Sequence, residues 1–205
     1  MTHELFTLGH SSSEFPVFAG LLRRFEVTLV VDVRSTPRSN RFPQFDQVEL
    51  ESSLKQESIR YLFLGEELGG RPDDPKAYRK DGLVDYRERR KSYAFHAGVE
   101  RVLSELAREN LALLCAEEDP ITCHRFLMIC PELIALGVEP HHIRKGGILE
   151  TQKAAEDRLL LSQQFGAVVG ASLFSDERDS ALENAYMAQA EKCAFRADPQ
   201  QLDPW

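Results

Sequence analysis

The sequence predicts an α/β fold: a three-layer sandwich around a largely parallel, Rossmann-like central sheet, with a helical extension at the C-terminus. Short apolar runs alternate with amphipathic stretches, which is the pattern of strand–helix repeats. The run at residues 27–33 is almost continuously apolar, as expected of a strand buried on both faces. Strand signals fade after residue 148, where only helical spacing continues. We therefore expect an α/β domain over residues 1–149 and a helical extension with a frayed end over residues 150–205.

In the first half of the chain, strands and helices alternate and end in an irregular insertion. The predicted elements are a strand at 5–8, a helix beginning after Ser13, a strand at 27–33, a helix at 46–57 and a strand at 59–64. Ser13 is the expected N-cap of the first helix, and Pro16 suits its first turn. Residues 65–91 are rich in Gly, Pro and charge, and an irregular segment of this length is typically functional or mobile.

The second half continues the alternation and then becomes helical. The predicted elements are a helix at 95–108, a strand at 111–115, a helix at 123–136, a strand at 138–143 and two helices at 151–165 and 178–193. Gly137 is the expected C-cap of the helix before it. Pro140 predicts an edge strand, because proline cannot donate a ladder hydrogen bond. A small-residue link at 166–172 separates the last two helices.

Composition and charge exclude several classes of protein. The 205 residues are 42% hydrophobic and 28% charged, which is typical of a globular domain. A formal net charge of −8 argues against a nucleic-acid coat and against an anionic membrane as partner. There is no apolar run of about 18 residues and no signal-peptide pattern at the start, so we expect no membrane span and a cytoplasmic location. Residues 71–91 are locally basic, which fits either one anionic ligand or a solvated loop of mixed charge.

Polar side chains follow the predicted strands at the points where those strands end. In open parallel sheets, ligands bind outside the carboxyl ends of the strands, so these side chains should meet at one rim. The expected catalytic residues are Cys123, His10, Glu117 and Asp32, and the expected substrate-binding residues are Arg34, Arg38, Arg125, Ser11 and His124. Arginine guanidinium groups in this set suit a phosphate or a carboxylate.

Cys123 has three interpretations that the sequence leaves open. At the start of a helix and beside Arg125, its thiol would ionise easily and act as a nucleophile. The same helix start could instead bind an anion, with Arg125 completing the clamp. The third possibility is a half-buried cysteine that only packs under the loop.

The other cysteines and the glycine-rich segments carry less specific signals. Cys115 ends an apolar strand, so we expect mainly a structural role, although a redox pair with Cys123 is conceivable. Cys115, Cys123, His124 and a later histidine would suit zinc, but no C-x2-C pair occurs. Neither a G-x-G-x-x-G motif nor a P-loop is present. We therefore expect no metal and no cofactor.

An ordered set of motifs resembles the family described as domain of unknown function 488. The motifs are Thr7–Ser11, Val31–Ser35 with Pro37–Ser39, Leu68–Arg71, Cys115–Glu117, Cys123–Arg125 and His142–Ile143. Ile121 and Thr122 stand where the family often has tryptophan and arginine. The resemblance implies an α/β fold and no settled activity. Asp32-Val33-Arg34 also looks like a piece of the rhodanese-type sulfurtransferases, but the spacing from cysteine to arginine does not match theirs.

These observations support three functions. We expect an enzyme acting on an anionic substrate, such as a phosphate-containing compound, a nucleotide or a nucleic-acid component, because acid, base and thiol groups share one rim. A non-catalytic module that binds a small anion or nucleotide is the alternative. A sulfur or redox carrier acting through Cys123 is the second alternative. The sequence leaves the oligomeric state open.

Overall fold

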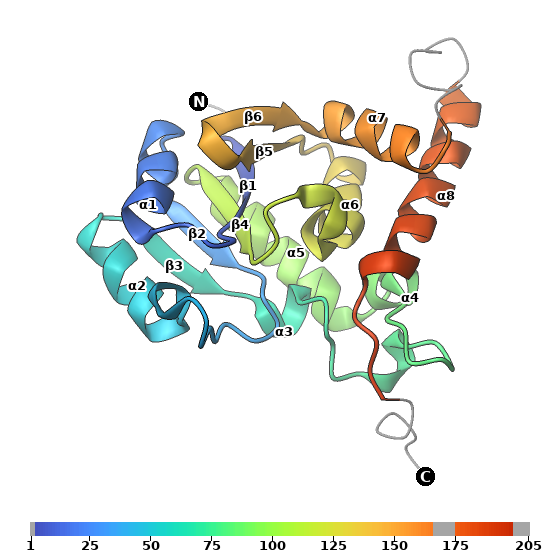
Figure 1. Cartoon of the computed structure of the whole chain (residues 1–205), viewed down its shortest axis with the longest axis horizontal. Helices are drawn as coiled ribbons and strands as arrows, with labels where there is room; N and C mark the ends of the chain where they lie inside the picture. Colours follow the sequence, from blue (N-terminus) through green and yellow to red (C-terminus); the bar gives the residue numbers. More distant parts are fainter. Residues whose placement is uncertain (1–2, 166–174, 199–205) are drawn as a thin grey trace.

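The computed structural model describes residues 3–165 and 175–198, and its core is one six-stranded sheet (Figure 1). The strands are β1 (Leu5–Gly9), β2 (Leu29–Asp32), β3 (Arg60–Phe63), β4 (Leu111–Cys115), β5 (Pro140–Arg144) and β6 (Ile148–Thr151). They lie in the order β3-β2-β4-β1-β5-β6, and only β6 is antiparallel to its neighbour. The strand order differs from the 3-2-1-4-5-6 order of the dinucleotide-binding fold. The predicted α/β class and largely parallel sheet are confirmed.

Two helical layers cover the sheet because the strands are apolar on both faces. Along β1, Phe6 and Leu8 face one layer and Leu5 faces the other. The first layer contains α1 (Phe15–Arg24) and α2 (Gln47–Gln56). The second contains α5 (Tyr93–Leu106), α6 (Cys130–Ala135), α7 (Gln152–Ser162) and α8 (Ser175–Cys193). The predicted helices at 46–57 and 95–108 therefore correspond to α2 and α5.

Three local expectations need correction. Helix α1 begins at Phe15 with Glu14 in the cap position, so Ser13 is not its N-cap. Strand β5 is not an edge, because β6 pairs with it; Pro140 is its first residue, where a missing N–H is tolerated. The helix predicted at 123–136 is divided into a π-helical turn at Arg125–Ile129 and α6. The cap at Gly137 is confirmed by its φ of +83°.

The C-terminal extension packs on the second layer and returns toward the long insertion. Ala155, Leu159 and Ala185 of α7 and α8 belong to the same core as the sheet. Figure 1 shows α8 running from α7 to the short helix α4 (Tyr86–Arg90). After α8 the chain pairs with residues 82–84 of the insertion, which also contains α3 (Gly65–Leu68). The predicted link at 166–172 and the end of the chain beyond 198 lie outside the described residues.

No helix in the described part of the chain combines the length and the apolar character that a bilayer crossing requires.

Candidate functional site

A cavity of about 750 Å³ opens where β1, β2 and β4 end, and we call it the rim cavity. Seven of the nine predicted site residues line it: His10, Ser11, Arg34, Arg38, Glu117, Cys123 and His124. They follow three different strand ends, as expected for parallel strands whose carboxyl ends share one edge. Gly9 permits the close approach of these segments, because a Cβ there would lie 1.7 Å from the carbonyl oxygen of Glu117.

The base of the rim cavity is a cluster of Cys115, Cys123 and His124. The Nδ1 atom of His124 lies 3.7 Å from the Cys115 sulfur and 3.8 Å from the Cys123 sulfur. Its Nε2–H donates to the carbonyl oxygen of Val33 at 2.9 Å, which fixes the ring with Nδ1 toward the two sulfurs. The Cys115 thiol also donates a hydrogen bond to Oε2 of Glu117 at 3.0 Å. Cys115, expected to be structural, is therefore part of this cluster.

The two cysteines of the cluster have opposite protonation preferences. Burial opposes ionisation of Cys123, but the Cys115 thiol, Arg125 and His124 together hold the pKa of Cys123 well below its usual value. The interaction with ionised Cys123, followed by burial, raises the pKa of Cys115 well above its usual value. Burial disfavours a charged His124, yet the Cys123 thiolate raises the pKa of His124. These shifts together favour a thiolate at Cys123, a thiol at Cys115 and a positively charged imidazole at His124.

Arg125 lies behind this cluster and does not line the rim cavity. Its side chain is 1% exposed, and its guanidinium donates to the carbonyl oxygens of Glu117 at 2.6 Å and Glu118 at 2.8 Å. Its Nε donates to Oγ1 of Thr7 at 3.2 Å. Within residues 3–165 and 175–198, no carboxylate forms an ion pair with it. Its position differs from the predicted ligand clamp, because the loop carbonyls occupy its donors.

Asp32, predicted as a base, is likewise outside the cavity lining. It is fully buried and forms an ion pair with Arg34, whose Nη2 lies 2.6 Å from Oδ2. The Arg34 Nε–H and the Tyr61 hydroxyl donate to the same carboxylate. With its acceptors filled, Asp32 fixes Arg34 at the cavity wall.

His10 and Ser11 form the wall that follows β1. His10 Nδ1–H donates to the carbonyl oxygen of Ser11, and Nε2 lies 3.3 Å from Nη1 of Arg34. Burial lowers the pKa of His10 to about 4, so the imidazole is neutral near pH 7 and its Nε2 accepts from Arg34. Ser11 has a φ of +47°, a strained conformation for a residue other than glycine. The N–H of Ser11 donates to the Ala116 carbonyl, which keeps this turn against the loop after β4.

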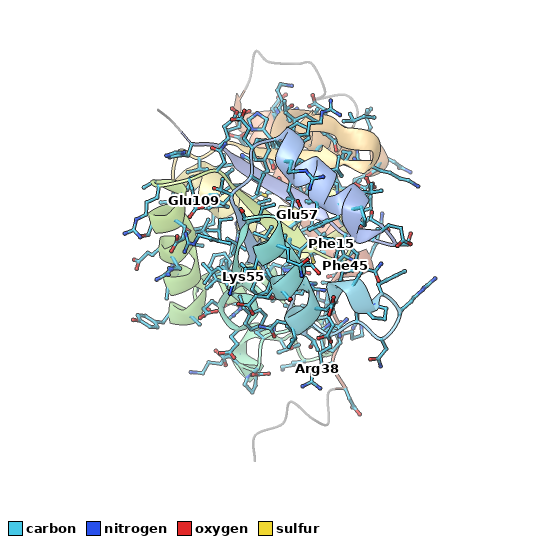
Figure 2. The ribbon with its side chains drawn as sticks, turned by 90° about the vertical axis from the view of Figure 1, so that its left-hand side faces the viewer. Phe15, Arg38, Phe45, Lys55, Glu57 and Glu109 are labelled. Atoms are coloured by element: carbon cyan, nitrogen blue, oxygen red, sulfur yellow. The ribbon has the colours of Figure 1, made fainter. Side chains whose placement is uncertain are left out.

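The mouth of the rim cavity is positively charged. Arg38, Arg41 and Arg71 line it and are exposed, and Figure 2 shows Arg38 pointing away from the body of the protein. In the part of the chain that the structure describes, neither Arg38 nor Arg41 has a carboxylate in ion-pair contact. Glu117 is the one carboxylate among the described lining residues. The remaining polar lining consists mainly of hydroxyl groups: Ser11, Ser12, Ser35, Thr36, Ser39 and Thr122.

The same cluster has the spacing of a metal site. One ligand atom from each of Cys115, Cys123 and His124 lies within 4.8 Å of the others, which would suit a thiophilic cation. However, Arg125 interacts electrostatically with both cysteines, and its own positive charge disfavours a second cation at that point. We therefore interpret the cluster as a thiolate site rather than a metal centre.

Two lining residues come from the C-terminal extension, where no sequence motif indicated a site. Cys193 ends α8, and Phe195 follows it in the segment that pairs with residues 82–84. The guanidinium of Arg71 lies over the Phe195 ring, 4.6 Å from its centroid. The one hint in the sequence was the locally basic segment at 71–91, which contains Arg71.

The comparisons with known proteins agree with the motifs. The family model described as "Domain of unknown function DUF488" matches residues 16–129, which is more than half of the chain. The matched region contains Arg34, Glu117 and Cys123, whereas His10 and Phe195 lie outside it. No curated protein and no solved structure matches the chain.

Proposed function

The chain belongs to the DUF488 family, and from that premise we propose an enzyme that acts on a phosphate-containing anionic substrate with the Cys123 thiolate as its nucleophile. One observation carries the proposal. Cys123, whose pKa is held well below its usual value by Cys115, Arg125 and His124, lies at the base of a cavity whose mouth displays arginines with no carboxylate partner among the described residues. Nucleophile and anion-binding groups therefore face the same space.

Charge balance supports a thiolate at Cys123. A buried guanidinium without a counter-ion is costly, and among the described residues no carboxylate forms an ion pair with Arg125, which donates to Thr7, to two loop carbonyls and to the Cys123 sulfur. Among the groups that can supply a negative charge, Cys123 has the largest electrostatic effect on the pKa of Arg125, ahead of Cys115 and Glu117. Ionised Cys123 thus stabilises the folded protein and is ready to attack an electrophile.

The residues divide into three roles. Cys123 attacks the phosphorus and forms a P–S bond while the P–O bond to the leaving group breaks, and Glu117 gives the departing oxygen its proton. Water then hydrolyses the P–S bond, giving its proton to Glu117 and releasing phosphate and the Cys123 thiolate. Arg38 and the hydroxyl of Ser11 bind the phosphate oxygens, with Arg41 at the mouth. Asp32 fixes Arg34 at the cavity wall, and Arg125 keeps Cys123 ionised.

Two readouts test this proposal together. We expect iodoacetamide to modify Cys123 of the full chain at pH 7, and pyrophosphate to protect it, as followed by peptide mass spectrometry. We also expect slow release of the phenol from an aryl phosphate by the native protein and none by Cys123→Ser. Protection without turnover would contradict catalysis and favour the non-catalytic anion-binding module. A Cys123 that reacts no faster than an ordinary thiol would exclude the nucleophile.

A second candidate, a redox or sulfur carrier, is favoured by Cys115 alone. Its thiol lies within 4.8 Å of Cys123, close enough for the two sulfurs to join after a modest movement. With oxidised glutathione, Cys123 would form a mixed disulfide and release one glutathione thiol; Cys115 would then displace the second. Intact mass would fall by two hydrogens after this exchange, and a persistent mixed disulfide would contradict it.

The cysteines also bear on location. All four are free thiols in the structure, and a nucleophilic thiolate survives best where thiols are kept reduced. We therefore propose the cytoplasm as the compartment in which the protein acts.

A further inference from the structure

We propose that the ring of Phe195 is a stacking platform for a planar base, which makes the substrate of the rim cavity a nucleotide. The inference rests on the function proposed above and names its substrate class. Phe195 is half-buried and lines the same cavity as Cys123. It lies outside the region matched by the family, so the extension of this particular chain would supply the recognition.

The platform is held in place by backbone pairing. The N–H of Val84 donates to the Phe195 carbonyl, and the N–H of Ala197 donates to the Gly82 carbonyl. Arg196, between them, forms an ion pair with Asp81 at 2.7 Å. A stacking ring is useful only if its position is fixed before the ligand arrives, because ordering it later costs binding free energy.

Arg71 joins this platform to the wall built by β2. Its guanidinium lies 4.6 Å from the centroid of Phe195, a cation–π distance, and its backbone N–H donates to Oγ of Ser35 at 2.9 Å. Ser35 lines the cavity directly after Arg34. The ring, the cation and the β2 loop therefore form one continuous surface.

The size of the cavity favours a ligand larger than a phosphate ion. About 750 Å³ is in the range of roughly 300–1,000 Å³ found for sites of drug-sized ligands and cofactors. A phosphate group bound to the arginines would leave much of this volume and the aromatic walls in contact with water. A second aromatic–arginine pair, Phe42 with Arg41 at 5.3 Å, lines the cavity as well. Aromatic faces combined with cations are the usual surface for nucleobases and their phosphates.

Charge favours a single nucleotide over a nucleic-acid strand. The protein has a net charge of −8, so a long polyanion would be repelled by most of its surface. The exposed guanidiniums of Arg38 and Arg41 are confined to the mouth of the cavity, enough for a short phosphate chain. We therefore assign the base to Phe195 and the phosphates to the arginines.

Calorimetric titration of the full chain with ADP, pyrophosphate and adenosine tests the assignment. We expect native protein to bind ADP more tightly than pyrophosphate, and Phe195→Leu to weaken ADP binding by about fivefold or more while leaving pyrophosphate unchanged. Phe195→Trp, the matched control, keeps a ring and should retain ADP binding. Urea midpoints of both variants establish that they remain folded.

The outcomes separate this inference from the proposed function. Equal losses of ADP and pyrophosphate affinity in Phe195→Leu, or no loss at all, would overturn the stacking role. Native protein that binds pyrophosphate as tightly as ADP would also overturn the stacking role. Binding requires no chemistry, so an unreactive Cys123 with ring-dependent ADP binding would overturn the nucleophile and leave the nucleotide site standing. A reactive Cys123 with no preference for ADP would overturn the nucleotide site and leave the nucleophile standing.

Discussion

Two buried arginines at the same end of the sheet have contrasting partners. Arg34 forms a bidentate ion pair with Asp32, to which Tyr61 also donates. Arg125 is as deeply buried but donates to two carbonyl oxygens and to Thr7. Both lie beside the rim cavity, so burial alone does not distinguish them.

The comparison shows which of the two arginines has a positive charge available to stabilise a neighbouring anion. The charge of Arg34 is neutralised within its own ion pair, so its main effect is to fix the cavity wall. The charge of Arg125 is left for the neighbouring sulfur and stabilises a thiolate at Cys123. The first arrangement supports structure and the second supports chemistry.

The largest effect, on the free energy of unfolding, is expected from breaking the ion pair between Asp32 and Arg34. Asp32→Asn keeps the shape of the side chain but leaves Arg34 buried without a counter-ion, which should cost about 3–5 kcal/mol of unfolding free energy. Urea denaturation measures it. Glu57→Gln, which breaks the exposed ion pair with Arg23, is the control and should cost at most about 1 kcal/mol. Equal costs would show that Arg34 is solvated rather than paired.

Next in size, counted for a single residue, is a pH effect, because each arginine has a neutral histidine nearby. Burial lowers the pKa of both His10 and His142 to about 4, with help from Arg34 and Arg125 respectively. The unfolded chain binds these protons near pH 6.5, before the folded protein does, so stability is full above pH 6.5 and falls toward pH 4. The loss should approach about 3 kcal/mol for each histidine.

His142→Gln separates the two contributions. The variant removes one titrating group, so the free energy of unfolding lost between pH 6.5 and pH 4, measured by urea denaturation, should shrink by about 3 kcal/mol. An unchanged decline would mean that His142 is already charged in the folded protein, despite its contacts with Thr7 and Gln152.

A smaller effect is expected from removing the positive charge of Arg125. Arg125→Met should raise the pKa of Cys123 and slow its alkylation at pH 6.5 by about tenfold or more, since a tenfold change corresponds to about one pKa unit. Arg125→Lys keeps the charge and should react within about threefold of the native rate. If methionine and lysine slow the reaction equally, packing rather than charge sets the reactivity of Cys123.

The smallest effect is predicted for Cys193, the cavity-lining cysteine that comes from the C-terminal extension. Burial raises the pKa of Cys193 to about 12, so it is an uncharged thiol at neutral pH although it is less buried than Cys123. Cys193→Ala should therefore change Cys123 alkylation by less than about twofold, as measured by peptide mass spectrometry. A larger change would indicate a direct interaction between the two sulfurs.

The sheet could be predicted from the sequence because its central strands carry their own signal. Strands β1, β2 and β4 are apolar runs, and polar residues directly after them had to meet at one edge. Strand β6 was missed because Ile148–Thr151 is short and largely exposed, so its pattern is weak. The prediction that Ser13 is the N-cap of α1 was wrong as well. Serine favours a cap position, but the start of the helix follows from the packing of Phe18 and Leu22.

The sequence predicted most of the residues that line the rim cavity, but it did not predict which of them would face the cavity and which would be buried behind it. Nothing in the sequence indicates that the carbonyls of Glu117 and Glu118 would point at Arg125, since this depends on the path of the loop. Phe195 reaches the cavity only because α8 returns the chain to residues 82–84, a contact between distant segments. Local patterns locate strand ends, whereas burial of a particular guanidinium is a property of the assembled fold.

The ionised state of Cys123 in the resting protein is most directly tested by the rate of its alkylation as a function of pH. The rate should already be at its plateau by pH 7, with a midpoint well below the value of about 8.5 for a free cysteine. A midpoint at or above about 8.5 would mean that Arg125 does not hold a thiolate, and would contradict the division between the two arginines.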